Sequence, residues 1–302
     1  MKLILLLFFA LFVSIAGAQG PSWVTPAVQA PHVAHHTFES SALQSKVSFH
    51  AYTPEVYELE KERRFPVLYW LHGTGGGLAG IAPVSAWFDA AIREGKMPPV
   101  VVVFPNGLAT SMWCDSKDGA VPMETLVVKE LVPHIDATFR TFAKREGRIV
   151  EGFSMGGYGA ARLGLKFPEV FGAASCLAGG PLDLDFQGPR TRANPAEREC
   201  ILRTTFGGDL DYFRAQSPLT LAEKQAAAVR GKVFMRVAAG SRDFTAALNR
   251  EFSSHLKRLN IDHTFIGVPG VGHETLPLLR GMGNEQWQFY RAALAAVSPT
   301  IR

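Results

Sequence analysis

One stretch near the middle of the chain, Gly152-Phe153-Ser154-Met155-Gly156, has the pattern Gly-x-Ser-x-Gly. It follows a short apolar run and precedes a segment with the small residues of a helix start. In such a strand-turn-helix the central residue adopts a strained backbone, and its neighbours must be small so that strand and helix do not collide. The turn exposes the serine hydroxyl above the carboxyl end of a sheet. The pattern therefore predicts a nucleophile at Ser154; the alternative is a glycine-rich connection with an idle serine.

The rest of the chain alternates apolar runs with segments of helical spacing. Near-continuous apolar strands are typical of parallel sheets covered on both faces. We therefore predict an α/β fold with a mostly parallel central sheet and helices on both faces. The expected strands are 32–38, 46–52, 65–71, 100–104, 148–153, 171–177, 233–240 and 263–268. The expected helices lie around 86–92, 123–139, 248–259 and 287–290.

The chain begins with Lys2, an apolar run and the small residues that end at Ala18. This pattern predicts a signal peptide over 1–18, with export to the periplasm or medium. The apolar run is too short for a membrane-spanning helix, although an uncleaved anchor remains the alternative. An irregular lead-in over 19–35 and one domain over 36–302 follow. Within that domain, Pro, Asp, Arg and Gly scattered over 180–220 predict an irregular, lid-like insertion beside the substrate.

Composition excludes several classes of protein. A formal net charge of +4, without a dense basic block, gives no support for binding nucleic acid or an anionic membrane. Hydrophobic residues make up 47% and charged residues 19%, as in globular proteins. Three cysteines do not make a disulfide scaffold. If one pair forms in an oxidising compartment, Cys114 with Cys200 is favoured over Cys176, which falls on an apolar strand. The oligomeric state is left open.

A serine needs a base to take its proton, and that base needs an acid to fix its tautomer. Asp243 follows one late strand and His273 follows the next, so both are expected at the edge of the sheet where Ser154 lies. We predict these three residues as a catalytic triad. Five other acids and bases fit less well because they lie in the insertion, in a helix, at a strand start or beside His273 itself. These are Asp209, Asp211, His255, His263 and Glu274.

A glycine-rich loop follows the strand 65–71 and begins at His72. It contains Gly-x-Gly-x-x-Gly at 75–80, the dinucleotide-binding pattern, but it starts beyond the strand and Pro83 is expected to interrupt the following helix. We interpret it instead as a loop whose N–H groups approach an oxyanion. Thr74 or Gly75 would donate together with the N–H of Met155.

Two further positions are candidate substrate contacts. His72 is expected to shape the glycine loop, and Trp113, in a loop after the strand 100–104, either lines the pocket or packs in the core. No metal site is predicted: His32, His35 and His36 fit a solvated strand edge better than a ligand set, because no cysteine or carboxylate joins them at ligand spacing. No cofactor is predicted either.

The segments 69–73, 152–159 and 269–273 resemble an esterase family that includes feruloyl esterases, S-formylglutathione hydrolases and mycolyltransferases. The similarity runs from about His36 to the C-terminus, with Ser-Met-Gly-Gly as its most specific part. The resemblance implies the α/β-hydrolase fold and a serine carboxylesterase that uses Ser154, Asp243 and His273, with Met155 and Thr74 as oxyanion donors. It does not choose the ester.

The sequence therefore predicts an exported serine carboxylesterase, with feruloyl or other carbohydrate-linked esters as candidate substrates. Acyl transfer to a sugar or lipid hydroxyl uses the same triad and remains an alternative. A non-catalytic carbohydrate-binding protein on a hydrolase scaffold is the alternative from another class.

Overall fold

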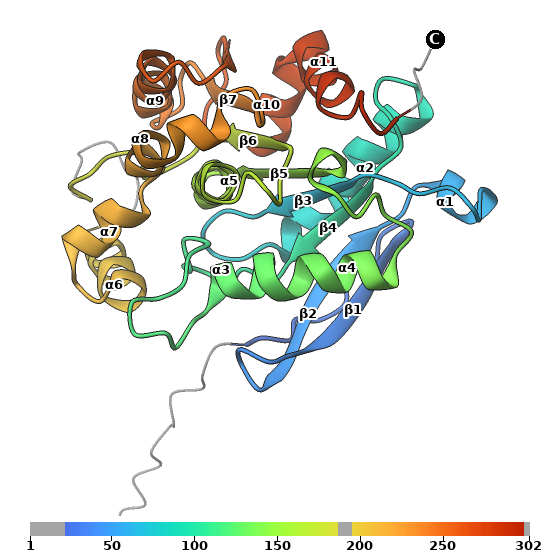
Figure 1. Cartoon of the computed structure of the whole chain (residues 1–302), viewed down its shortest axis with the longest axis horizontal. Coiled ribbons are helices and arrows are strands. Elements are labelled where there is room, and N and C mark those ends of the chain that lie inside the picture. The colour runs from blue at the N-terminus through green and yellow to red at the C-terminus, as the bar shows by residue number, and fades with distance from the viewer. Residues whose placement is uncertain (1–21, 187–194, 299–302) are drawn as a thin grey trace, which may run out of the picture.

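The computed structural model describes residues 22–186 and 195–298 (Figure 1). The predicted signal peptide lies outside these residues. An eight-stranded sheet forms the centre, in the order β1-β2-β4-β3-β5-β6-β7-β8. β2 pairs antiparallel with β1 and β4, and the other neighbours are parallel. The strands are β1 (Val33–Ser40), β2 (Ser45–Tyr52), β3 (Val67–Leu71), β4 (Val101–Pro105), β5 (Arg148–Phe153), β6 (Ala173–Leu177), β7 (Phe234–Gly240) and β8 (His263–Val268). The predicted mostly parallel α/β sheet is confirmed.

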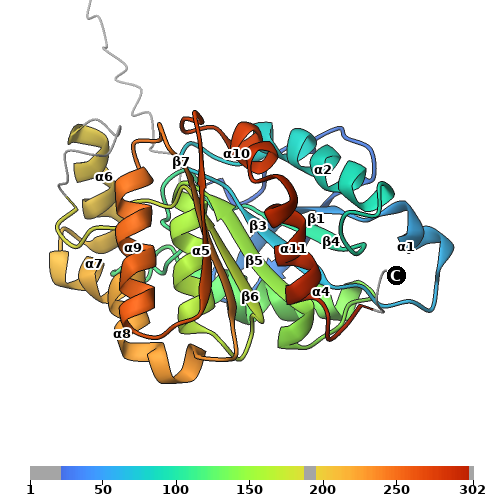
Figure 2. The same cartoon turned by 90° about the horizontal axis from the view of Figure 1, so that it is seen from above.

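Helices cover both faces of this sheet (Figures 1 and 2). The core on one face includes side chains of α2, α10 and α11, and the core on the other includes those of α4, α5, α8 and α9. The helices are α1 (Glu55–Leu59), α2 (Leu78–Arg93), α3 (Met123–Thr125), α4 (Val132–Thr138), α5 (Met155–Lys166), α6 (Pro195–Phe206), α7 (Leu210–Gln216), α8 (Pro218–Val229), α9 (Ala246–Arg258), α10 (Thr275–Gly281) and α11 (Gly283–Ala293). A π-helical turn, Leu126–Leu131, joins α3 to α4, and Arg145–Gly147 form a 3₁₀ turn.

The apolar strands owe their position to burial on two sides. Every residue of β3, β4, β5 and β6 is buried. β1 lies at one edge of the sheet and carries a half-exposed pattern instead. The sheet begins at Val33, before the predicted domain boundary at residue 36, and Trp23 and Val28 of the lead-in also pack against the core.

Helix α2 corrects one expectation. It starts at Leu78 and continues through Pro83 to Arg93, although proline was expected to interrupt it. Pro83 lacks the N–H that would bond one turn back, a loss that usually costs about 3 kcal/mol. Packing offsets this cost, because Ile81, Val84 and Phe88 on the same helix are all buried against the sheet.

The segment 180–220 is also more regular than expected. Helices α6 and α7 occupy most of its described part, and α8 begins at Pro218. The carboxylate of Asp209 accepts the N–H groups of Asp211 and Tyr212 and so caps α7. The hydroxyl of Ser217 caps α8, with Pro218 at the first helical position. An N-cap aspartate or serine, and a proline at the first helical position, are features that the sequence shows directly.

The three cysteines are free. Cys114 and Cys176 are buried, and Cys200 is exposed on α6. The favoured disulfide between Cys114 and Cys200 is therefore not formed: Cys114 is buried in the core, whereas Cys200 is exposed on α6.

A buried ion pair crosses the centre of the sheet. Glu151 on β5, Ser175 on β6 and Arg236 on β7 are aligned in register. The Arg236 guanidinium lies 3.1 Å from the Glu151 carboxylate, and both side chains are 0% exposed. The Tyr290 hydroxyl of α11 lies 2.9 Å from each Glu151 oxygen. Burial raises the pKa of Glu151, whereas Arg236 and Tyr290 oppose that rise.

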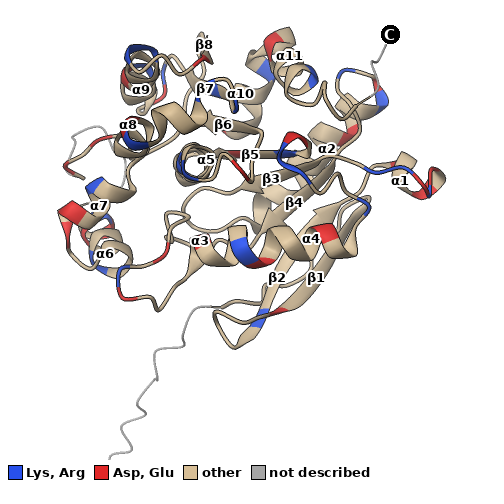
Figure 3. Cartoon of the chain, viewed as in Figure 1, with Lys and Arg blue, Asp and Glu red and all other residues tan. Residues whose placement is uncertain are grey.

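Basic and acidic residues are interspersed over the described chain (Figure 3). Within that part of the chain, none of the helices combines the length and apolar character needed to cross a bilayer.

The histidines of β1 and β2 predict an acid-sensitive edge. The His35 and His50 rings lie 4.9 Å apart, and the Nε2 of His50 accepts the N–H of Val28. Burial, with His35 second, lowers the pKa of His50 from 6.5 to about 4. As the pH falls, His50 is therefore protonated in the unfolded chain before it is protonated in the folded protein. The free energy of unfolding decreases between pH 6.5 and pH 4, by at most about 3 kcal/mol.

We expect His50→Gln, which keeps an acceptor for Val28, to reduce this loss. Urea unfolding at pH 7 and at pH 4.5 measures it. An equal acid-induced loss in both proteins would contradict the assignment.

Candidate active site

Ser154 lies at the sharp turn between β5 and α5. Its φ of 60° is in the region that side chains avoid. A Cβ at Gly152 or Gly156 would collide with the carbonyl of Leu71 on the neighbouring strand. The two glycines therefore let β5 and α5 approach β3. The strained backbone at Ser154 is the one expected for the central residue of the predicted strand-turn-helix.

The structure brings the three predicted catalytic residues together. The Nε2 of His273 lies 2.9 Å from the Oγ of Ser154, and its Nδ1 lies 2.8 Å from the Oδ2 of Asp243. An ionised carboxylate can only accept, so Nδ1 carries the proton and Nε2 accepts from the serine hydroxyl. These are the contacts that activate a serine nucleophile.

Asp243 is held as a carboxylate. Its burial favours the neutral acid, but hydrogen bonds from His273 and from the N–H and hydroxyl of Thr245 outweigh that effect, so the pKa of Asp243 is lowered. The two Thr245 donors both lie 2.8 Å from Oδ1. Oδ2 is left to bind His273.

Two aromatic rings flank the His273 imidazole. The Phe153 and Phe244 centroids lie 4.6 and 4.4 Å from it. Phe153 precedes the nucleophile and Phe244 follows the acid, so neighbours of both partners orient the base.

The two residues predicted to donate backbone N–H groups to an oxyanion, Met155 and Thr74, lie beside Ser154. Met155 is the first residue of α5, where an α-helix supplies no carbonyl for its N–H. Thr74, from the loop after β3, lines the same pocket as Met155 and Ser154. The candidate Gly75 is wrong, because its N–H already donates to the carbonyl of Ala109, at 3.0 Å.

His72 shapes the glycine loop and is not among the residues that line the pocket at Ser154. The ring is buried, its Nδ1 donates to Gly73 O at 2.7 Å, and its Nε2 accepts the N–H of Gly107 at 3.0 Å. Burial lowers its pKa. The neutral ring therefore ties the glycine loop to the loop after β4, as expected, and the role as a substrate contact is wrong.

Trp113 is also a core residue, at 0% exposure. Its Nε1 donates to the carbonyl of His72, and its ring fills the space beside Gly107 and Gly159. The prediction that it contacts substrate is therefore wrong, and the packing alternative is correct.

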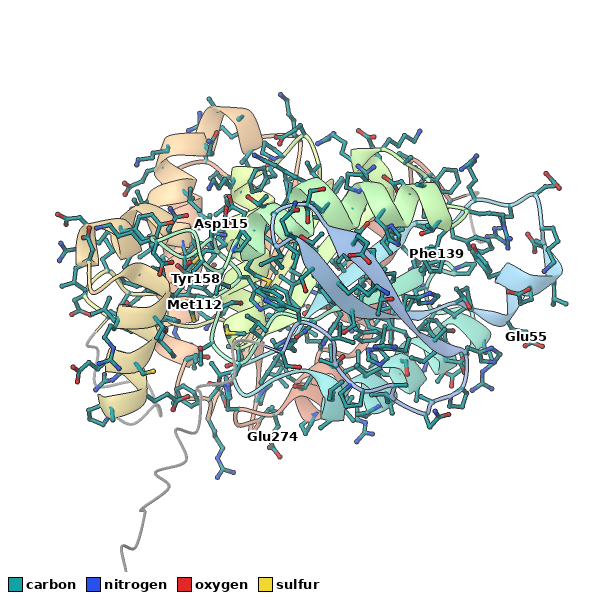
Figure 4. All side chains as sticks on the ribbon, turned by 90° about the horizontal axis from the view of Figure 1, so that it is seen from below. Glu55, Met112, Asp115, Phe139, Tyr158 and Glu274 are labelled. Carbon is teal, nitrogen blue, oxygen red and sulfur yellow. The ribbon has the colours of Figure 1, made fainter. Side chains whose placement is uncertain are left out.

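Its neighbour Met112, labelled in Figure 4, takes the place in the pocket. Met112 and Trp113 both have a φ of 54°, a conformation that needs support. The buried guanidinium of Arg162 supplies it by donating to the Trp113 carbonyl at 2.7 Å, while also pairing with Glu124 at 2.6 Å. The sequence of this loop does not predict the positive φ of the two residues.

The pocket above Ser154 encloses about 280 Å³. Its walls are mostly apolar and come from segments far apart in the sequence. Sequence reasoning missed these lining residues: Met112, Pro181, Phe186, Ile201, Phe244 and Leu248. Phe186 in turn packs on Phe206 and Phe213, so the segment 180–220 supports one wall.

A second cavity of about 790 Å³ lies beside this pocket. Three pairs of consecutive residues lie where the two meet; the first-named member of each pair lines the catalytic pocket and the other lines the second cavity. These pairs are Thr74 with Gly75, Met112 with Ser111, and Ile201 with Cys200.

The other acids and bases considered from the sequence do not reach Ser154. Asp209 caps α7 and pairs with Lys117, Asp211 pairs with Arg214, and His263 contacts Ser253. His255 contacts the carbonyl of Leu219, and Glu274 precedes α10 without joining the triad. Among residues 22–186 and 195–298, no group of three or more His, Cys, Asp or Glu is placed to hold a metal ion.

Comparison with known proteins agrees with this fold. The family described as "Putative esterase" matches residues 40–301. Esterase Rv1288 of Mycobacterium tuberculosis is 30% identical over 267 residues, which cover 82% of this chain and 57% of the relative. The chain thus spans little more than half the length of that curated relative.

Solved structures share the architecture. A ferulic acid esterase superposes with a TM-score of 0.65 at 24% identity, covering 87% of this chain and 95% of the other. The S-formylglutathione hydrolase of Staphylococcus aureus gives 0.66 at 20% identity, covering 88% and 100%. With the family match spanning most of the chain, this protein belongs to the esterase family and has the α/β-hydrolase fold.

Proposed function

We propose that the protein is a serine carboxylesterase. The observation that carries the proposal is the continuous chain of hydrogen bonds from Asp243 through His273 to Ser154, at 2.8 and 2.9 Å, beneath a pocket lined by Thr74 and Met155. Family membership supports it. These groups meet the needs of acyl transfer: a nucleophile, a base, an acid that orients the base, and donors for an oxyanion.

The reaction follows from the geometry. Ser154 Oγ attacks the ester carbonyl carbon while His273 Nε2 takes its proton. The negative carbonyl oxygen binds the N–H groups of Met155 and Thr74. When the carbon–oxygen bond to the alcohol breaks, His273 returns the proton to the leaving alcohol. Water then attacks the acyl-enzyme by the same route and releases the acid.

The direct test is hydrolysis of p-nitrophenyl acetate by the purified protein, together with a fluorophosphonate label located by mass spectrometry. We expect turnover and a label on Ser154. A folded protein without either would overturn the proposal.

We propose aryl esters as the preferred substrates. Export and family resemblance suggested this preference, and the support expected from Trp113 is lost because that ring is buried. Phe186, Phe244 and Met112 instead give the pocket flat and polarizable walls. One of the solved structures with the same architecture is named a ferulic acid esterase.

We expect kcat/KM for methyl ferulate to exceed that for methyl butyrate, because only the aryl acid covers the aromatic wall. Steady-state rates under identical conditions measure the ratio. Equal values would remove the case for an aryl preference without affecting the esterase proposal.

Acyl transfer is a second candidate, because a second cavity of about 790 Å³ borders the pocket and has room for an acceptor alcohol. Product analysis with a glycoside present distinguishes the two reactions. An acylated glycoside indicates transfer, and free acid alone indicates hydrolysis.

We further propose that the protein is exported and cleaved after Ala18. The leader pattern of residues 1–18 supports this. The intact mass of the protein recovered from its host tests it, and a retained leader would contradict it.

A further inference from the structure

Asn249 lies in α9 with its side chain fully buried. Its Nδ2 donates to the carbonyls of Gly179, at 2.9 Å, and Thr245, at 3.0 Å. Its Oδ1 accepts the N–H of Gly179, at 3.2 Å. A buried amide satisfied in this way ties together the two segments that it contacts.

The first segment, 177–180, supports the nucleophile turn. Ser154 N–H donates to the carbonyl of Leu177 at 2.9 Å, and Gly180 N–H donates to the carbonyl of Ser154 at 3.3 Å. Gly179 also packs so closely on Gly157 that a Cβ at Gly157 would collide with it. Moving this segment would move Ser154.

The second segment, 243–245, carries the acid. Thr245 N–H and Oγ1 both bind Oδ1 of Asp243, at 2.8 Å. Ser154 and Asp243 follow β5 and β7, which are separated by β6, so no strand pairing joins these two residues directly. Beyond the strand ends, the Asn249 amide spans the gap.

We propose that Asn249 and Thr245 are positioning residues: Thr245 fixes the rotamer of Asp243, and Asn249 fixes the acid loop relative to the Ser154 turn. Neither touches the reacting atoms. The inference rests on the proposed esterase function, because the alignment of Ser154, His273 and Asp243 affects a reaction rate only if these residues catalyse ester hydrolysis.

The first variant is Thr245→Val, which removes the hydroxyl but keeps the shape and the backbone N–H. Without the hydroxyl, Oδ1 of Asp243 keeps only the Thr245 N–H and the carboxylate is held less tightly. Small misplacements of catalytic groups cost about 10- to 100-fold in rate. We expect kcat to fall by that factor with KM within about two-fold of the wild type, since the pocket volume is kept. Thr245→Ser keeps the hydroxyl and should restore kcat.

The matched control is Thr141→Val. The Thr141 hydroxyl is buried and donates to an aspartate, Asp136, at 2.6 Å, but it precedes β5 at the opposite end from Ser154. The Thr141→Val variant loses the same kind of hydrogen bond, from a threonine hydroxyl to an aspartate, so we expect a lower free energy of unfolding with an unchanged kcat. A fall in kcat that merely follows lost stability in both variants would overturn the proposal.

The second variant is Asn249→Leu, which removes the amide at similar volume. We expect kcat to fall at least as far as in Thr245→Val, with a slower rate of fluorophosphonate labelling at Ser154. Because Asn249 bonds Thr245, and Thr245 in turn bonds the Asp243 carboxylate, the double variant should lose less than the product of the two single losses. If Asn249→Leu does not fold, Thr245→Val and its serine rescue still decide the question.

Wild-type turnover and labelling are measured in the same series. Active wild type with unchanged kcat in Thr245→Val overturns the positioning role alone. Wild type that neither hydrolyses nor labels overturns the esterase proposal and the positioning role with it.

Discussion

Replacing Ser154 by alanine is expected to lower kcat/KM by about 10⁵- to 10⁶-fold, as in other enzymes that depend on an activated serine. The change removes the hydroxyl that donates to His273 Nε2 at 2.9 Å. It leaves His273 and Asp243 in contact and keeps the Cβ that the pocket already accommodates. Ester hydrolysis under steady-state conditions and covalent labelling measure the loss, and circular dichroism checks the fold.

A matched variant, Ser154→Gly, separates the backbone from the chemistry. The φ of 60° at Ser154 is strained for any residue with a Cβ. Glycine relieves that strain, although it adds entropy to the unfolded chain, and we expect a net gain of about 1 kcal/mol in the free energy of unfolding with activity equally lost. Activity that persists in either variant would contradict a role for the Ser154 hydroxyl.

Removing one member of the buried ion pair is expected to have the largest effect on stability. Arg236→Met leaves the carboxyl group of Glu151 fully buried without its positive partner, with Tyr290 as a remaining donor. Such a change usually costs about 3–5 kcal/mol in the free energy of unfolding. Urea unfolding followed by fluorescence measures it.

The double variant Glu151→Leu, Arg236→Met is the informative partner. It removes both charges. It leaves the Tyr290 hydroxyl without its acceptor, and it leaves Ser175 Oγ and Gln286 Oε1 without the donor that Arg236 provides. We expect it to be more stable than Arg236→Met alone, since the uncompensated charge is gone. Losses that simply add would contradict a direct interaction between the two side chains.

Much of the fold was predictable because it depends on local pattern. The runs of β3 and β4 are apolar at every position, and that pattern fits a strand covered on both sides. The order of Ser154, Asp243 and His273 at successive strand ends likewise follows from chain topology. The structure places these three residues in contact, as that order predicts.

The predictions that were wrong concern features that depend on tertiary packing rather than on local sequence. Pro83 stays inside α2 because neighbouring apolar side chains are buried, a gain that local propensity does not contain. Gly75 is excluded as a donor only by the distant carbonyl of Ala109. Trp113 turns inward because two consecutive residues take positive φ, which leaves Met112 at the pocket.

Some missed features had a signal. Thr245 stands two residues after Asp243, the spacing at which an aspartate accepts a nearby N–H. The capping residues of α7 and α8 mark helices in a segment whose composition predicts irregular structure. Asn249 had none, because its distant partner, Gly179, follows β6 and reaches α9 only in the folded protein.

The unequal exposure of the three cysteines makes the native chain suitable for site-specific spectroscopy. Cys114 and Cys176 are shielded, whereas Cys200 is open to a thiol-reactive dye. It stands next to Ile201, which lines the catalytic pocket, and itself faces the second cavity. A fluorophore attached there reports occupancy of either compartment by a change in emission, so ligands can be screened on the unmutated protein without following turnover.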